Sequence, residues 1–226
     1  LARTTFDMQL ASEMTHTVRR TLSGAGMHIL GPQEMITDAA QAHAAAQALS
    51  TDAVDLLLIF QATFADSTMI RALTDVVDAP VFLWAVPEEH TGARLRLNSF
   101  CGINLAGHAL TLTGRKYDYT YSTPDDAQAI EKIRLRAQAG FVLRQFRTAQ
   151  MGVVGEHPDG MDSCHLDDAF LKSKFGLQVQ RIGLQEVFQR ARAASPAEVA
   201  QARGLISHKL HNLDELDQKP LNGTLS

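Results

Sequence analysis

Pro80-Val-Phe-Leu-Trp-Ala-Val86, followed after a polar loop by Leu95–Gly114 (LRLNSFCGINLAGHALTLTG), decides the fold of this chain. The first stretch is a short continuous apolar run, which is typical of a strand buried on both faces. The second carries apolar residues at about 3.6-residue spacing, which predicts a helix. A strand, a loop and a helix in this order form the repeating unit of a parallel α/β sheet.

The same alternation extends along the whole sequence. It predicts a doubly wound parallel sheet (Rossmann/flavodoxin-like) over residues 1–148 and the start of a second α/β domain over 149–226, truncated by the chain end. Because helix periodicity starts almost at once, the first domain is expected to lack its first strand. The predicted strands are Met27–Leu30, Val54–Phe60, Val81–Val86, Tyr117–Tyr121, Met151–Val154 and Leu177–Ile182. The other predicted helices are residues 8–22, Thr37–Leu49, Ser67–Val77, 122–147, Asp167–Phe175, Leu184–Ala193 and one that begins after Ser195.

Three helix starts carry recognisable capping signals. Thr37 is predicted to cap the Ala-rich helix, and Ser122 to cap the long helix, with a proline and two acidic residues in its first turn. Ser195-Pro-Ala-Glu198 has the hydroxyl and the glutamate of a capping box. These signals place the helix boundaries.

Composition narrows the class of protein. The chain has 226 residues, a net charge of −4 and 6% aromatic residues. This balance argues against nucleic acid as a partner. Cys101 and Cys164 have no CxxC spacing and fit free thiols in a reducing cytoplasm. No apolar run is long enough to predict a membrane span.

Two polar residues share one face of the helix in Leu95–Gly114. Asn104 and His108 lie four residues apart, and together they offer an amide and an imidazole to a polyhydroxy ligand. The alternative interpretation is structural, with a polar first turn and a core histidine bonded to a backbone carbonyl. The chemistry of the residues leaves both open.

Other motifs give weaker signals. Glu88-Glu89-His90 is most simply a solvated loop. His157 and His165 flank further metal-capable side chains, but the spacing matches no standard zinc site. These motifs therefore do not predict a metal site in this chain.

Several loops, taken in chain order, carry short motifs of one enzyme family. They are Thr63-Phe64, the Asn104-x-x-x-His108 helix, and Met161 ahead of Lys174-Phe175-Gly176. The opening Leu-Ala-Arg-Thr-Thr-Phe-Asp places Arg3 in a further loop. This collinear series resembles the L-fucose isomerase/L-arabinose isomerase superfamily, with the opening typical of its fucose-isomerase-like branch.

The resemblance implies an aldose–ketose isomerase that uses a divalent metal, usually Mn²⁺, in the full-length protein. Its metal ligands are expected outside this chain, which on its own is expected to be inactive. The implied substrate-binding residues are Arg3, Thr63, Phe64, Asn104, His108 and Met161. The family also implies a cytoplasmic homo-oligomer, a trimer or hexamer, in which this domain contributes sugar contacts to a neighbouring subunit.

Departures from the family pattern leave the sugar open. Fucose isomerases lack a counterpart of His108, and arabinose isomerases lack the opening that contains Arg3. The alternative function is a non-catalytic sugar-binding or regulatory α/β module. Because loops at the carboxyl ends of neighbouring parallel strands meet, the isomerase interpretation predicts one rim that holds Arg3, Thr63, Asn104 and His108.

Overall fold

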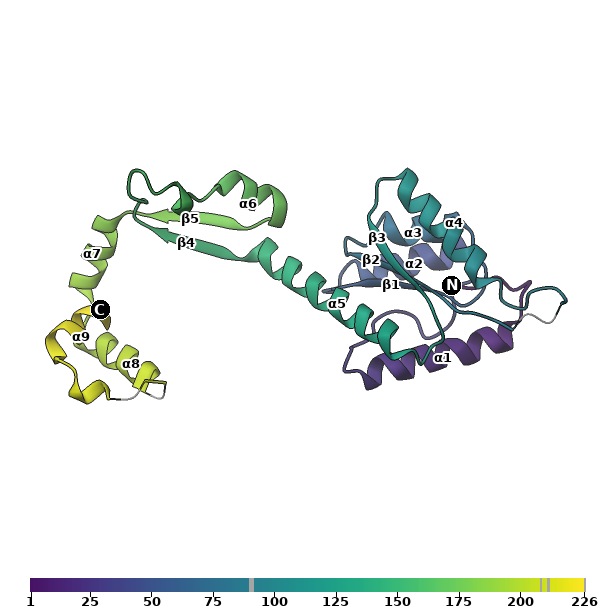
Figure 1. Cartoon of the computed structure of the whole chain (residues 1–226), viewed down its shortest axis with the longest axis horizontal. Helices are drawn as coiled ribbons and strands as arrows, with labels where there is room; N and C mark the ends of the chain where they lie inside the picture. The colour runs from purple at the N-terminus through teal and green to yellow at the C-terminus, as the bar shows by residue number, and fades with distance from the viewer. Residues whose placement is uncertain (90–91, 208, 211, 226) are drawn as a thin grey trace. The chain divides into compact units, whose positions relative to one another are not determined.

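The chain has the predicted mixed α/β architecture. The computed structural model describes residues 1–89, 92–207, 209–210 and 212–225. It divides into two compact units, Leu1–Gln145 and Phe146–Ser226 (Figure 1). Each unit contains a parallel sheet, so the predicted α/β class is confirmed.

The sheet of the first unit has three described strands. They are β1 (Leu57–Gln61), β2 (Val81–Ala85) and β3 (Tyr117–Tyr121), paired in parallel in that order. Leu57 lies opposite Val81, and Val81 lies opposite Tyr117. Every residue of β2 is buried, as the apolar run 80–86 predicts.

Alternate residues of the strands enter two separate cores. Leu57, Ile59 and Leu83 pack with α2 (Ala39–Leu49), α3 (Ser67–Thr74) and α4 (Ser99–Leu112). On the other face, Phe60, Phe82 and Trp84 pack with α1 (Met8–Gly24) and α5 (Ala127–Thr148) (Figure 1). The period-two direction of strand side chains therefore covers both faces of the sheet with helices.

Two of the predicted caps are wrong, and one is confirmed. The side chain of Asp38, rather than Thr37, accepts a hydrogen bond from the Gln41 N–H at the start of α2. At the start of α5, Asp126 takes the place predicted for Ser122. In both cases the carboxylate next to the first turn is a charged acceptor that the helix dipole also favours. Ser195 and Glu198 exchange the two hydrogen bonds of a capping box.

The strand predicted at Met27–Leu30 does not form. The segment is extended, and its exposure alternates between half-buried Met27 and Ile29 and exposed His28 and Leu30. It lacks a hydrogen-bonded neighbouring strand among the described residues, and β1 is the edge strand of the described sheet. The local pattern is therefore that of a strand, but the ladder that defines one is missing.

The second unit is built on a two-stranded parallel sheet. Its strands are β4 (Gln150–Val154) and β5 (Gln178–Ile182). The helices are α6 (Asp168–Phe175), α7 (Leu184–Ala193), α8 (Pro196–Ser207) and α9 (Gln218–Leu225), with 3₁₀ turns at Asp162–Cys164 and Leu213–Glu215. Among its described residues only Leu177 and Leu213 are buried apolar side chains. None of the helices in the described ranges of the chain is long and apolar enough to cross a membrane.

We predict that Gly140→Ala destabilises the first unit strongly. Gly140 lies on α5, and a Cβ atom there would stand 1.8 Å from the carbonyl oxygen of Asp55. Because the obstacle is backbone, the helix must shift, and we expect a loss of about 3 kcal/mol in the free energy of unfolding. Chemical denaturation followed by circular dichroism measures it.

Gly24→Ala is the matched control. Gly24 is also helical and belongs to the same unit, but nothing lies within 4 Å of the added Cβ atom. This control should leave stability unchanged or raise it slightly. Equal stabilities for the two variants would show that α5 does not pack on the Asp55 carbonyl.

Candidate functional site

Polar side chains gather where the strands of the first unit end. In open parallel α/β sheets, ligands bind outside the carboxyl ends of the strands. In this unit, residues 62–66 follow β1, and residues 86–98, described at 86–89 and 92–98, follow β2. The segment Leu1–Asp7 lies beside them. We therefore describe the site from these three segments, which we call the carboxyl edge.

Arg3 and Thr63 are brought together at this edge, as the sequence predicts. The backbone N–H of Arg3 donates a hydrogen bond to the Thr63 hydroxyl at 2.7 Å, and that hydroxyl donates to the Phe64 carbonyl. Thr63 is fully buried, so its side chain fixes the backbone of residues 1–3. The Arg3 guanidinium pairs with Asp66 and remains partly exposed. The carboxyl edge thus presents the Arg3 guanidinium, and the buried Thr63 hydroxyl holds the backbone of Arg3 in place.

An aromatic pair lies next to this arginine. The rings of Phe6 and Phe64 have centroids 6.2 Å apart, and the Arg94 guanidinium lies 5.5 Å from the centroid of Phe6. The Phe64 backbone N–H donates to the Leu97 carbonyl at 2.8 Å, which ties the loop after β1 to the loop after β2. The carboxyl edge therefore places two guanidinium groups beside apolar ring faces.

Ser99 fastens the amino end of α4 to two strand ends. Its hydroxyl accepts from the Val86 N–H at 3.1 Å and donates to the Gln61 carbonyl. Ser99 and Gln61 are both buried. A Cβ at Gly102 would lie 2.9 Å from Gln61 Oε1 and 3.3 Å from the Ala65 nitrogen, so any larger residue there would require the Gln61 side chain to shift.

Glu88 organises the loop that leads into α4. Its carboxylate accepts three successive backbone N–H groups, those of Arg96, Leu97 and Asn98, at 2.6–2.9 Å. Asn98 has a left-handed backbone with φ of 53°. Its Oδ1 is buried without a hydrogen-bond partner among the described residues. This amide oxygen is therefore a buried acceptor at the carboxyl edge.

Asp7 joins the same loop to α1. It caps the helix by accepting from the Leu10 N–H at 3.0 Å and forms an ion pair with Arg96 at 2.6 Å. The backbone hydrogen bond from Leu10, followed by the hydrogen bond from Arg96, lowers the pKa of Asp7. The carboxyl edge is therefore a network of carboxylates and guanidiniums rather than an isolated residue.

Sequence reasoning missed Asp66, Glu88 and Asn98 as members of this edge. Asp66 lies three residues after Thr63 in the same loop, and this closeness in sequence could have identified it. Glu88 is part of the stretch interpreted above as a solvated loop, but its carboxylate is occupied by backbone donors. His90, the third residue of that stretch, lies outside the described residues.

Asn104 and His108 are exposed on α4, so the interpretation of His108 as a core histidine is wrong. The expected single rim of Arg3, Thr63, Asn104 and His108 stays a prediction, but the course of α4 argues against His108 as a member. Gly102 lies over the end of β1, whereas Gly107, next to His108, faces Tyr117 at the start of β3. At 1.5 Å per helical residue, His108 is about 15 Å along α4 from Asn98. Within one chain, His108 therefore lies toward the amino ends of the strands.

The second unit places Met161 on an exposed turn. Its carbonyl accepts from the Cys164 N–H at 2.9 Å, and its side chain is half exposed. Nearby, the rings of His157 and His165 have centroids 5.7 Å apart. Over the part of the chain that the structure describes, no three His, Cys, Asp or Glu side chains are arranged to hold a metal ion.

Comparison with known proteins identifies the family. The family model described as the N-terminal domain of fucose/sulfoquinovose isomerases matches residues 1–138, which is more than half of the chain. The chain belongs to this family. The predicted membership of the fucose-isomerase-like branch is thereby confirmed.

Relatives in this family are sulfoquinovose isomerases. The one from Alkalicoccus urumqiensis is 30% identical over 192 residues, which cover 85% of this chain and 43% of the relative. Those from Priestia aryabhattai and Clostridium sp. (strain MSTE9) are both 26% identical, over 189 and 217 residues. These two alignments cover 84% and 95% of this chain, and 42% and 48% of the relatives. The chain thus spans less than half the length of these relatives.

We predict that Ser99→Ala loosens the carboxyl edge. The substitution leaves the Val86 N–H and the Gln61 carbonyl buried without the hydroxyl that pairs them, which costs about 1–3 kcal/mol of unfolding free energy. Ser23→Ala, an exposed position on α1, is the control and should cost less than about 0.5 kcal/mol. Denaturant unfolding of both variants measures the difference. A Ser99 variant as stable as the control would contradict this account of the edge.

Proposed function

We propose that these 226 residues form the N-terminal portion of an aldose–ketose isomerase that acts on sulfoquinovose. The observation that carries the proposal is the family match over residues 1–138, the segment that builds the carboxyl edge. Three relatives, all sulfoquinovose isomerases, support the choice of sugar.

The charge of the edge supports an anionic sugar. Arg3, Arg94 and Arg96 all lie on the segments that form it. Arg3 and Arg96 are paired with carboxylates, whereas Arg94 has no carboxylate partner among the described residues and rests on the Phe6 ring. A guanidinium presents several donors in one plane, which suits the oxygens of a sulfonate.

The exposed face of α4 supports a role at a subunit interface. Asn104 and His108 are exposed on the same helix as Phe100 and Leu112. Polar groups beside exposed apolar side chains are typical of a surface that another chain covers. We infer that Asn104 and His108 contribute to the sugar site of a neighbouring subunit in a homo-oligomer, a trimer or hexamer, while Arg3, Thr63 and Phe64 serve their own edge. Met161 remains a proposed contact from the second unit.

A divalent ion, Mn²⁺ in our proposal, completes the chemistry in the full-length protein. The described residues do not offer a three-ligand group for it, so we propose ligands beyond these 226 residues. When bound, such an ion supplies Lewis acidity and a template for adjacent sugar oxygens. The role of this chain is to bind and orient the sugar. Its two cysteines, both free and exposed, support the proposed cytoplasmic location.

The direct test is isomerisation by the full-length protein. We predict that it converts sulfoquinovose to its ketose with a kcat/KM at least about tenfold higher than for quinovose, the same sugar without the sulfonate. The assay follows ketose formation with Mn²⁺ present. If the protein isomerises neither of the two sugars, the proposed function is contradicted. Equal kcat/KM values would contradict only the role given to the arginines.

A second prediction concerns His108. In the full-length protein, His108→Ala should lower kcat/KM about 5- to 150-fold, the equivalent of about 1–3 kcal/mol, because a hydrogen bond to a sugar hydroxyl is lost. The melting temperature should stay unchanged because the side chain is exposed. His43→Ala, exposed on α2, is the control and should leave both properties unchanged. An unchanged kcat/KM for the His108 variant would remove this residue from the site.

A further inference from the structure

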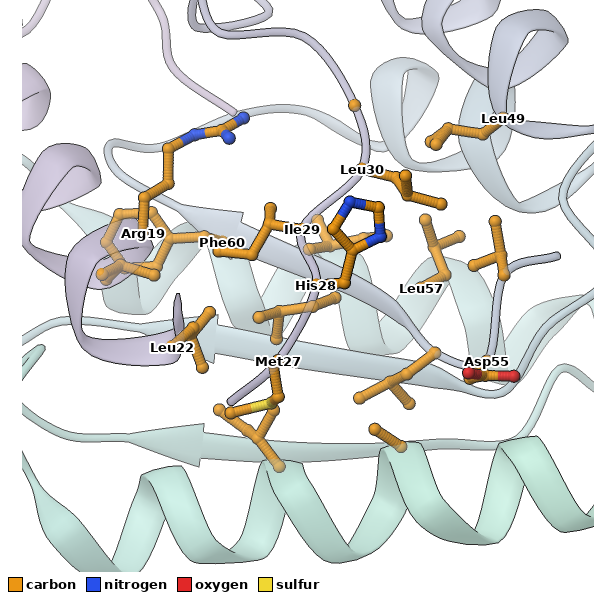
Figure 2. Close-up of a pocket in the computed structure, with 18 of the residues that line it drawn as sticks. Arg19, Leu22, Met27, His28, Ile29, Leu30, Leu49, Asp55, Leu57 and Phe60 are labelled. Atoms are coloured by element: carbon orange, nitrogen blue, oxygen red, sulfur yellow. The ribbon is translucent and has the colours of Figure 1, made fainter. Parts of the chain in front are cut away.

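The two edges of the sheet in the first unit have different surroundings. Beside β1, the extended segment 27–30 lies along a largely apolar cavity of about 730 Å³. Figure 2 shows Met27, Ile29 and Leu57 among the side chains that line it. Beside β3, the described sheet has no further strand. This second edge is therefore open to a strand of another chain unless side chains close it.

The backbone groups at the free edge of β3 belong to its tyrosines. The Ser122 N–H donates to the Ala85 carbonyl at 3.1 Å, and Tyr121 is the register partner of Ala85. In a parallel ladder, alternate residues direct their N–H and C=O groups to opposite sides of the strand. The even-numbered residues of β3 therefore bond toward β2, whereas Tyr117, Tyr119 and Tyr121 direct their backbone groups away from it.

The composition of β3 favours pairing with another strand. Its sequence, Tyr-Asp-Tyr-Thr-Tyr, has no proline or glycine and only one charged residue. Tyrosine and threonine favour strands, and short segments of this kind with little charge tend to pair with other chains. All three tyrosines are exposed. Such an edge stays single only if its backbone groups are blocked.

Asp118 and Lys132 occupy both backbone groups of Tyr119, the middle residue of this edge. The Asp118 carboxylate accepts from the Tyr119 N–H at 2.8 Å, and the Lys132 ammonium donates to the Tyr119 carbonyl at 2.8 Å. The same carboxylate and ammonium pair with each other at 2.8 Å. A strand that approached β3 would therefore find neither group of Tyr119 free.

Lys132 reaches this edge from α5. Its ammonium lies 5.4 Å from the centroid of the Phe82 ring and 5.8 Å from the centroid of the Tyr119 ring. Phe82 is buried and Tyr119 is exposed, so the ammonium lies between the core and the free edge. Two aromatic faces, a carboxylate and a carbonyl thus hold this one cation.

Asp118 is charged at neutral pH. Burial raises the pKa of its carboxyl, but hydrogen bonds from Lys132 and from the Tyr119 N–H outweigh burial, so the pKa lies below its usual value. The ion pair that holds the Lys132 ammonium beside Tyr119 therefore persists at neutral pH.

We propose that Asp118 and Lys132 form an edge guard, which keeps the β3 strands of two copies of this chain from pairing. Without the guard, two copies pair antiparallel about a two-fold axis, with Tyr119 opposite Tyr119. In this register the two Tyr119 residues exchange both backbone hydrogen bonds, and Tyr117 of each copy pairs with Tyr121 of the other. The edge guard contains none of the residues of the carboxyl edge.

A second copy fits this edge because the strand complements itself. In the antiparallel register, Asp118 of one copy lies opposite Thr120 of the other, so like charges do not meet. The tyrosines lie opposite one another on one face, and aromatic cross-strand pairs stabilise a sheet.

The test replaces Lys132 by methionine in the 226-residue chain. Lys132→Met removes the donor to the Tyr119 carbonyl and keeps an unbranched apolar side chain beside Phe82. We predict that this variant self-associates at least about tenfold more tightly than the wild type, measured by sedimentation equilibrium over roughly 1–100 μM. Lys132→Arg, which can still donate to the carbonyl, should behave like the wild type.

Arg136→Met is the matched control. Arg136 lies on the same helix and donates to the second carboxylate oxygen of Asp118 at 2.8 Å, but within the described residues it does not bond to the backbone of β3. The control therefore loses the same charge beside the same carboxylate and leaves the edge guard in place. Its self-association should match that of the wild type.

Amide exchange locates the contact between copies. In Lys132→Met, the Tyr117 and Tyr121 amides should exchange at least about tenfold more slowly at high protein concentration than at low concentration, because they become paired. In the wild type and in Arg136→Met, exchange of these two amides should not depend on concentration.

Two results would overturn the proposal. One is a Lys132→Met variant that self-associates no more tightly than Arg136→Met. The other is tighter association without concentration-dependent exchange at Tyr117 and Tyr121, because the copies would then meet elsewhere. If circular dichroism shows that Lys132→Met does not fold, Asp118→Ala takes its place, since it frees the Tyr119 N–H, and the same two results decide.

Discussion

The burial of β2 on both faces is the constraint on which the first unit depends. Phe82 and Trp84 point into one core, whereas Val81, Leu83 and Ala85 point into the other. This strand must therefore lie between two neighbours, with helices above and below. That arrangement directs the loops after β1 and β2 to one edge, where Ser99 bonds to the ends of both strands. The candidate site is thus a consequence of how the core is packed.

The sequence predicts the fold where local pattern and tertiary environment agree. Tyr117–Tyr121 and Leu184–Ala193 form the predicted elements with the predicted bounds. Met27–Leu30 has the pattern of a strand but lacks a pairing strand among the described residues, so propensity alone is insufficient. The misplaced caps at Thr37 and Ser122 have a simpler cause, because a carboxylate lay closer to the first turn than the hydroxyl.

The site is less predictable than the fold because its members are joined by backbone geometry. The family motifs predict Thr63 and Arg3 as site residues, and the Arg3 backbone N–H donates a hydrogen bond to the Thr63 hydroxyl. Glu88 acts through three backbone N–H groups, and Asn98 through a left-handed turn, and neither feature has a distinct sequence signature. The four-residue spacing of Asn104 and His108 predicts that they share one face of a helix. It does not predict which end of the sheet His108 lies near. These two kinds of contact lie on different parts of the first unit. This separation agrees with our proposal that His108 contributes to the sugar site of a neighbouring subunit.

A crystal structure of the full-length protein with sulfoquinovose bound tests this central claim most directly. The measurement is the set of distances from the sugar oxygens to Arg3 Nη and Arg94 Nη of one subunit and to His108 Nε2 of its neighbour. The account predicts hydrogen-bond distances, about 2.7–3.2 Å, to at least one arginine of the first subunit and to the histidine of the second. A sugar bound far from the carboxyl edge, or contacted by residues of a single subunit alone, would contradict it.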